Sequence, residues 1–116
     1  MAITYIDTER CPQTKLPDAH GAVAEIVNRD LCGAQNVIGM LRWLEAGEQF
    51  DAEPLPGKHQ LIYLMDGNGV ISLGTQEHEM PKGAGLYLGP RESASLRQAG
   101  DLPLKLLHLI VPESFD

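Results

Sequence analysis

Two stretches decide the fold of this chain: GEQFDAEPLPGKHQLIYLMDG, from Gly47 to Gly67, and GAGLYLGPRESASLRQ, from Gly83 to Gln98. In both, short apolar segments alternate with Gly and Pro, which is typical of strands joined by turns. The positions that define their spacing are Gly47, Glu53, Leu55, Gln60 and Gly67 in the first stretch, and Gly83, Pro90, Ala94 and Gln98 in the second.

This spacing resembles that of the cupin family, whose two motifs read G-x5-H-x-H-x4-E-x6-G and G-x5-P-x-G-x2-H-x3-N. The family's histidines and glutamate hold a metal ion, and the matching positions here carry Glu53, Leu55, Gln60 and Ala94. Leu55 and Ala94 offer no lone pair to a metal, and Gln60 offers only a neutral carbonyl. The resemblance therefore implies the fold of the family without its metal ligands, and we expect no metal cofactor.

Apolar segments of a few residues, separated by Gly and Pro, recur along the rest of the chain without a helical period. This pattern predicts an all-β protein. The resemblance implies more specifically a double-stranded β-helix, the jelly-roll barrel of cupins. We expect a single domain over residues 1–116, with a core barrel over about residues 35–112. Residues 1–34 then form a packing segment or an edge strand, for which Ile3 to Ile6 is the candidate.

Two turns are predicted from their residue types. Asp66-Gly67-Asn68-Gly69 lies between two apolar segments, and Gly and Asn tolerate positive φ, so we expect a tight hairpin there. Gly74 and Thr75 predict a second hairpin, between residues 71–73 and the short segment at 78–80.

Composition and charge exclude several functions. The net charge of −7 disfavours nucleic acid and anionic membrane surfaces as partners, since both attract Lys and Arg. The first residues carry charges rather than a signal peptide's apolar core, and the apolar run from Leu106 to Val111 is too short to cross a membrane. Two cysteines without a Cys-x-x-Cys pairing fit reduced thiols. We expect a cytoplasmic protein.

Glu53 and His108 are the candidate catalytic residues. Glu53 replaces the family's first ligand histidine, where an inward carboxylate could serve as acid or base; a solvated loop carboxylate is an equal interpretation. His108 lies in LKLLHLIVP. Lys105 must reach solvent, so strand alternation turns Leu106, His108 and Ile110 inward. An uncharged histidine inside a barrel could shuttle protons, or it could be a hydrogen-bonded core residue.

Nine further residues are candidates for ligand binding. A glutamate of the family at the position of Gln60 would face inward, and the two-residue period gives Ile62 and Leu64 the same direction. Arg42 interrupts an apolar strand and could pair with a substrate carboxylate, or it could lie on a solvated face. The complete set is Arg42, Leu55, His59, Gln60, Ile62, Leu64, Tyr87, Ala94 and Leu96.

The leading hypothesis is a metal-free cupin that binds a small, mostly apolar organic ligand in its barrel cavity. An alternative is a non-redox enzyme, a lyase, isomerase or cyclase, that uses Glu53 and His108 as acid and base. A metal-dependent dioxygenase is a third hypothesis. It would need a substitute ligand set of Glu53, His59 and His108, although alternation turns His59 away from the cavity unless a bulge intervenes.

The strand HQLIYLM is apolar on both faces, because Leu61, Tyr63 and Met65 alternate with the inward residues. Leu41 and Trp43, on a neighbouring strand, could extend this outer patch. Large apolar patches on a soluble protein usually mark an interface. Within one chain, only the N-terminal segment of residues 1–30 could cover this patch. We expect instead a homodimer that pairs these outer sheet faces, with a small molecule as the other partner.

Overall fold

A computed structural model describes residues 7, 11–27 and 37–112, and every regular element among them is a β-strand. None of the described segments forms a helix that could cross a membrane. The strands are β1 (Thr14–Lys15), β2 (Ala22–Val27), β3 (Ile38–Leu44), β4 (Gln49–Ala52), β5 (Lys58–Asp66), β6 (Gly69–Leu73), β7 (Gln76–Met80), β8 (Gly85–Leu88), β9 (Ala94–Gln98) and β10 (Leu104–Pro112).

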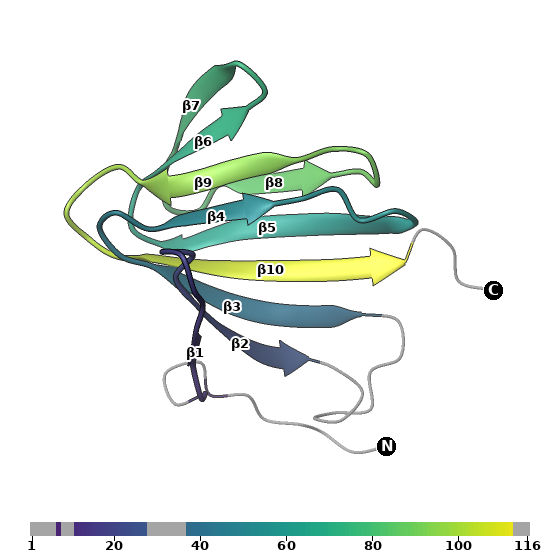
Figure 1. Ribbon diagram of the computed structural model, residues 1–116, viewed down its shortest axis with the longest axis horizontal. Coiled ribbons are helices and arrows are strands. Elements are labelled where there is room, and N and C mark those ends of the chain that lie inside the picture. The colour runs from purple at the N-terminus through teal and green to yellow at the C-terminus, as the bar shows by residue number, and fades with distance from the viewer. Residues whose placement is uncertain (1–6, 8–10, 28–36, 113–116) are drawn as a thin grey trace.

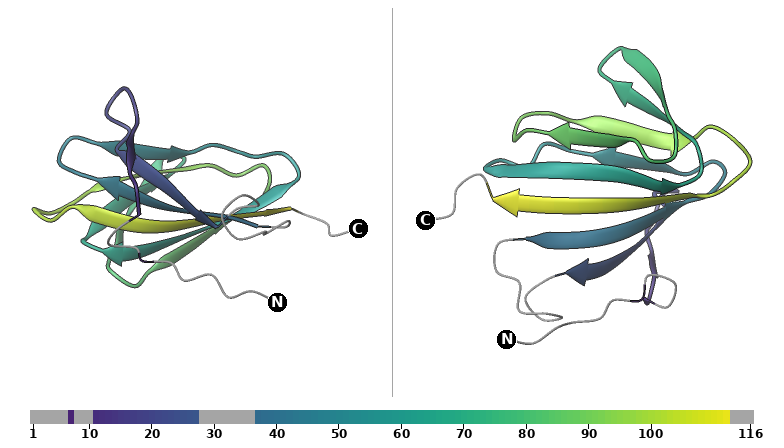
Figure 2. Two further views of the ribbon diagram at one scale, coloured as in Figure 1. Left: turned by 90° about the horizontal axis from the view of Figure 1, so that it is seen from below. Right: turned by 180° about the vertical axis from the view of Figure 1, so that it is seen from behind.

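The strands form two antiparallel sheets (Figures 1 and 2). One sheet has six strands in the order β1-β2-β3-β10-β5-β8, and the other has four in the order β4-β9-β6-β7. Strands that are distant in sequence lie side by side, as β10 does between β3 and β5. This arrangement confirms the predicted all-β jelly-roll fold.

The core lies between the sheets, and β5 shows how the sequence directs it there. Gln60, Ile62 and Leu64 are buried on its inner face, whereas Leu61 and Tyr63 are 44% and 41% exposed on its outer face. The predicted alternation is therefore confirmed. Both sheets contribute apolar side chains to one buried cluster: Leu44, Ile62, Leu64, Leu88, Leu104 and Leu106 from the larger sheet, and Phe50, Ala52, Ile71, Met80, Ala94 and Leu96 from the smaller.

Strand β10 follows the predicted alternation with one correction. Leu106 and His108 are buried on its inner face, as expected. Lys105, which we expected to reach solvent, is only 8% exposed. It is paired in register with Trp43 on β3 and with Asp66 on β5, so neighbouring strands flank it on both sides. A long lysine side chain can bury its apolar stem in such a place.

The two predicted turns have different outcomes. Gly74 and Thr75 join β6 to β7 in a two-residue hairpin, and Gly74 has the positive φ (64°) that such a turn needs. The predicted hairpin at Asp66 to Gly69 is wrong. The chain does turn there, but β5 pairs with β8 and β10 while β6 pairs with β7 and β9, so the turn carries the chain from one sheet to the other.

The N-terminal part of the chain adds an edge to the larger sheet. β2 pairs with β3, and the two-residue β1 pairs with β2 (Figure 1). The outer face of these strands differs from the predicted patch, because Leu41 is completely buried within the single chain, and Ala24, its partner on β2, and Ile26 are also buried. The candidate strand Ile3 to Ile6 lies outside the described residues.

Candidate functional site

Three polar side chains on adjacent strands of the larger sheet form a chain of hydrogen bonds inside the barrel. Arg42 on β3 donates its Nε–H to Nδ1 of His108 on β10, at 3.2 Å. The other ring nitrogen, Nε2, lies 2.8 Å from Oε1 of Gln60 on β5. Gln60 in turn donates through Nε2 to the backbone oxygen of Glu53, at 2.9 Å. We call these three side chains the Arg42 network.

The donors and acceptors of this network fix the tautomer of His108. Arginine can only donate, so Nδ1 of His108 must accept and Nε2 must carry the proton. Nε2–H then donates to the carbonyl oxygen of the Gln60 amide, which leaves the amide nitrogen to donate to Glu53. Every polar atom of the imidazole and of the Gln60 side chain is thereby satisfied, as buried groups require.

His108 is held in its neutral form. Burial, reinforced by the positive charge of Arg42, lowers the pKa of His108 from 6.5 to about 4. The imidazole is therefore uncharged near neutral pH, as an acceptor for the Arg42 guanidinium has to be. The aromatic ring of Phe50 on β4 packs against it, with ring centroids 5.2 Å apart.

Arg42 brings a positive charge into this largely apolar surrounding. Its guanidinium carbon lies 4.2 Å from the centroid of the Phe50 ring, in cation–π contact, and Nη2 lies 3.8 Å from Sδ of Met40. Burial lowers the pKa of Arg42, but an arginine remains protonated in proteins. None of the ion pairs found among the described residues includes Arg42.

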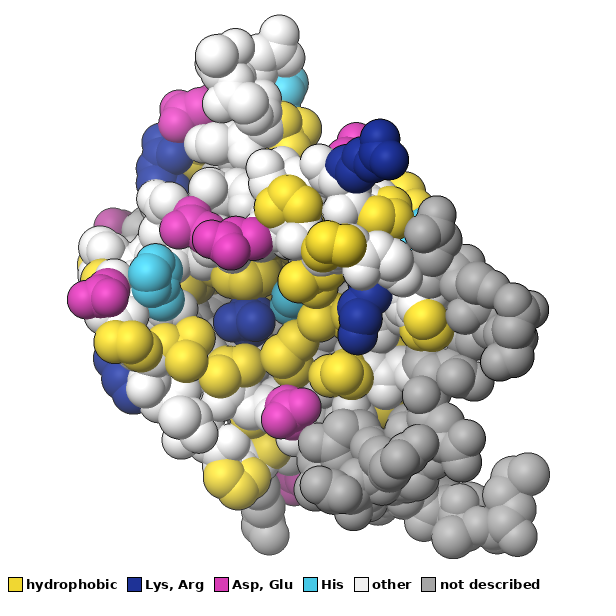
Figure 3. Space-filling model, turned by 45° about the vertical axis from the view of Figure 1, so that its right-hand side comes forward, with side chains coloured by type: hydrophobic (Ala, Val, Ile, Leu, Met, Phe, Trp, Pro, Cys, Tyr) yellow, Lys and Arg dark blue, Asp and Glu magenta, His cyan; other side chains and the backbone are white. Residues whose placement is uncertain are grey.

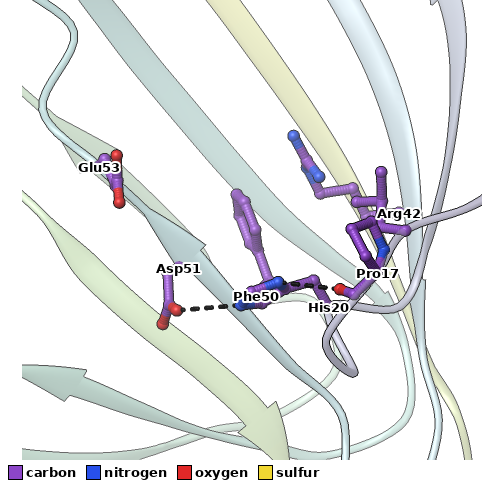
Figure 4. A pocket seen from close by; sticks show the side chains of 7 residues that line it. Pro17, His20, Arg42, Phe50, Asp51 and Glu53 are labelled. Carbon is purple, nitrogen blue, oxygen red and sulfur yellow. Dashed lines mark hydrogen bonds and ion pairs between the residues drawn. The ribbon is translucent and has the colours of Figure 1, made fainter.

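A cavity of about 290 Å³ opens onto Arg42 and Phe50. Figure 3 shows the hollow on this face, with Lys or Arg and His side chains deep inside a ring of hydrophobic ones and acidic side chains at its border. Figure 4 shows the cavity from close by, with contributions from β3, β4 and the loop between β1 and β2. The lining residues are Leu16, Pro17, His20, Arg42, Phe50, Asp51 and Glu53.

The border of the cavity is held by polar contacts around Asp51. Asp51 accepts hydrogen bonds from Gln49 and Ser95, each at 2.7 Å, and these bonds lower the pKa of its carboxyl. Nε2 of His20 lies 3.5 Å from the same carboxylate, while Nδ1 of His20 donates to the backbone oxygen of Pro17 at 3.1 Å. Asp51 is therefore an ionised carboxylate that already has partners.

The predicted catalytic pair is divided by this geometry. Glu53 lies exposed at the border and lines the cavity with its side chain. His108 contacts Arg42 and Phe50 but is not among the residues that line the cavity. The link between them runs through the Gln60 side chain to the backbone of Glu53, not to its carboxylate.

The nine predicted ligand-binding residues fall into three groups. Arg42 and Gln60 belong to the network, and Arg42 also lines the cavity. His59 and Tyr87 lie on the outer face of the larger sheet, where the Tyr87 hydroxyl is hydrogen-bonded to Nδ1 of His59 and the two rings stack 5.6 Å apart. Ile62, Leu64, Ala94 and Leu96 are buried in the apolar cluster of the core, whereas Leu55 is half-buried in the loop between β4 and β5, outside that cluster.

The sequence analysis identified neither Phe50 nor His20 as a residue of the site. Phe50 and Ala52 alternate with exposed neighbours on β4, and this period of two was the available signal that Phe50 points into the barrel. His20 carried no such signal, because a long-range loop contact brings it to Asp51.

Comparisons with known proteins bear on the fold. No family model matches the chain. An uncharacterised protein of Methanocaldococcus jannaschii is 29% identical over 48 residues, which is 41% of this chain and only 38% of that protein. A crystal structure of a predicted oxalate decarboxylase from Thermotoga maritima superimposes with a TM-score of 0.81 at 15% identity, covering 94% of this chain and 99% of the other.

A cupin protein from Bacteroides fragilis superimposes with a TM-score of 0.69 at 20% identity, over 90% of this chain and 88% of its own. The chain has the cupin fold. A polyketide cyclase from Streptomyces resistomycificus is also similar, with a TM-score of 0.78 at 9% identity, over 97% of this chain and 81% of the other. Structures with this fold thus include enzymes, but identities this low establish the fold alone.

The cupin fold raises the question of a metal, and the residues here do not fit one. At the four positions that match the family motif, Leu55 and Ala94 have no donor atom. Both amide atoms of Gln60 are engaged within the protein, by His108 and by the Glu53 backbone. The substitute set fails because His59 points outward, and no group of three His, Cys, Asp or Glu suited to a metal occurs among the described residues.

Proposed function

We propose that this cupin is a metal-free module that binds a small organic molecule at the mouth of its barrel. The observation that carries the proposal is the cavity on Arg42, where a guanidinium that pairs with no carboxylate of the described residues is held in place by His108. A buried or half-buried charge is costly unless something compensates it, and sites that bind ligands commonly keep such groups.

The cavity defines the size of the ligand. Its volume of about 290 Å³ is at the low end for small-molecule sites, which typically span roughly 300–1,000 Å³. The deeper part of the barrel is filled by the apolar cluster, so the ligand lies near the mouth. There Leu16, Pro17 and Phe50 supply apolar walls for a mostly apolar body.

A non-redox enzyme is the second candidate function. The presence of a polyketide cyclase among proteins of similar structure favours it, as does the carboxylate of Glu53 on the cavity wall. Its weakness is His108, whose two nitrogens are both hydrogen-bonded inside the protein and whose lone pair faces Arg42. General acid–base chemistry needs a group that can reach the substrate proton.

A fragment screen tests the binding proposal. We expect aromatic and aliphatic fragments to shift backbone amide signals of Phe50, Asp51 and Glu53 in NMR spectra of the ¹⁵N-labelled protein, and to raise its melting temperature. A Tyr87→Phe variant is the matched control, because Tyr87 lies on the outer face and its change should leave the binding unaltered. Binding that maps elsewhere, or no binding at all, would contradict the proposal.

Metal analysis and metal removal test whether the module is metal-free. Because the four motif positions offer so few donor atoms, we expect protein purified without chelator to contain less than about one metal ion per ten molecules. Adventitious binding alone would give a metal content of this order. EDTA should change neither the melting temperature nor the fragment binding. A stoichiometric metal whose removal abolishes binding would overturn the metal-free assignment.

A further inference from the structure

We infer that the ligand of this cavity is a small monocarboxylate with an uncharged body, whose carboxylate binds the guanidinium of Arg42. The inference rests on the proposed function and names the chemistry of its ligand. It follows from three features of the cavity: the N–H groups of Arg42 that meet no strong acceptor among the described residues, the arrangement that fixes their direction, and the negative charges at the border.

The first feature is the set of donors that Arg42 has left. A guanidinium carries five N–H groups, and the protein uses Nε–H for His108. One Nη2–H faces the Met40 sulfur at 3.8 Å, which is a weak acceptor. The remaining N–H groups have no acceptor among the described residues. A carboxylate offers two oxygens in the planar geometry that a guanidinium binds best.

The second feature is the fixed direction of the guanidinium. His108 accepts from Nε on one side, and the Phe50 ring lies 4.2 Å from the guanidinium carbon on its face. Gln60 holds the imidazole in the tautomer that can accept. His108 and Gln60 are thus positioning residues for Arg42. An arginine held in this way loses little conformational freedom when it binds an anion, which favours affinity.

The third feature is the charge of the border. Asp51 and Glu53 line the same cavity as Arg42, and in Figure 4 they lie on the opposite side of Phe50 from Arg42. Two carboxylates at the border would repel a second anionic group on the ligand. The cavity therefore accommodates one carboxylate at its inner end, and it disfavours dicarboxylates whose second charge reaches the border.

Matched acid and amide pairs test the carboxylate directly. The probes are benzoate with benzamide, cyclohexanecarboxylate with its carboxamide, and hexanoate with hexanamide, titrated by NMR into the full chain. We expect at least one acid to bind about tenfold or more tightly than its amide, the size expected for a charge-assisted contact. Amides that bind as tightly as their acids would overturn the inference while leaving the binding function intact.

The variant Arg42→Gln should remove this preference, so that acid and amide bind equally. If that variant does not fold, Arg42→Lys is the substitute, because it keeps the charge but loses the planar guanidinium with its paired N–H donors. It should weaken binding of the acid without changing binding of the amide. Unchanged discrimination in a folded variant would overturn the inference. If no compound of any charge binds the wild-type protein, both the inference and the proposed function fail.

Terephthalate tests whether the carboxylates at the border of the cavity repel a second anionic group. Compared with benzoate it adds a second carboxylate at the far end of the ring, and we expect it to bind several-fold more weakly. Glu53→Gln should reduce this difference, since it removes one of the two border charges and should therefore strengthen terephthalate binding more than benzoate binding. Terephthalate that binds the wild-type protein better than benzoate would show that the border does not repel anions.

Discussion

At the scale of the residue, His108 shows why a buried polar group need not be a catalyst. Its two nitrogens meet one donor and one acceptor, and its ring packs on Phe50. An uncharged imidazole satisfies this arrangement, whereas an imidazolium would place a second N–H against the guanidinium of Arg42. The same contacts that make His108 a support for Arg42 therefore make its protonation unfavourable.

This predicts a pH dependence of stability. Because the folded pKa of His108, about 4, lies below the ordinary value of 6.5, the unfolded chain binds the proton more readily. The contribution of this pKa difference to the free energy of unfolding is fully present above about pH 6.5. It is lost as the pH falls towards 4, and the total loss is about 3 kcal/mol. Urea unfolding across this pH range measures it.

The control for this prediction is His108→Gln, which keeps an acceptor for Arg42 but cannot titrate. The carboxylates that also lose stability in acid are common to both proteins, so the difference between them isolates His108. We expect the difference in unfolding free energy between the wild-type protein and the variant to shrink as the pH falls from 6.5 to 4. Parallel pH profiles, or an imidazole signal that titrates near pH 6.5, would contradict the assignment.

Parts of the Arg42 network could be predicted from the sequence. The family resemblance correctly placed Gln60 inward, and the two-residue period of β5 and β10 did the same for Ile62, Leu64 and His108. The orientation of Arg42 could not be decided in this way, because a single cation in an apolar strand is compatible with either face. What decides it is Phe50, which comes from the other sheet and whose position depends on the complete fold.

At the scale of the element, residues 66–69 show that turn chemistry is local while strand pairing is not. Gly67 has a φ of 85°, so the sequence correctly predicted that the chain would turn. The partners of β5 and β6 are set by β10 and β9, which come much later in the chain. The sequence signal for a turn therefore could not distinguish a hairpin from a crossing between sheets.

Gly67 and Gly74 make a matched pair for a test of this turn. Both have positive φ, but a Cβ on Gly67 would lie 2.7 Å from the backbone oxygen of Pro103, whereas nothing lies within 4 Å of one on Gly74. We expect Gly74→Ala to cost about 1 kcal/mol of unfolding free energy and Gly67→Ala about 2–3 kcal/mol. Equal losses in urea unfolding would mean that the approach of Pro103 has no energetic consequence.

At the scale of the whole molecule, the outer face of the six-stranded sheet is covered at one end and open at the other. Leu41 on β3 is fully buried, so the single chain covers that part of the face. On β5 and β8 the same face exposes Leu61, Tyr63 and Tyr87, the last at 57%. The sequence predicted the apolar character of this face, but not how far the chain itself would cover it.

The open end of this face is where we propose that two copies of the chain meet. Leu61 and Tyr63 project from adjacent outward positions of β5, and covering such side chains contributes up to roughly 1.5–3 kcal/mol each when burial is complete. A two-fold axis would place this patch against its own copy. We expect light scattering at micromolar concentration to give twice the chain mass of 12.7 kDa.

The variant Leu61→Glu should give a monomer. If the faces stayed paired, the interface would bury two introduced carboxylates, one from each copy, which would repel each other and lose their hydration. Leu73→Glu is the matched control. Leu73 is 36% exposed at the β6–β7 hairpin, in the other sheet, so this change should leave the dimer intact. A wild-type mass of 12.7 kDa, or a Leu61→Glu variant that still dimerises, would exclude this interface.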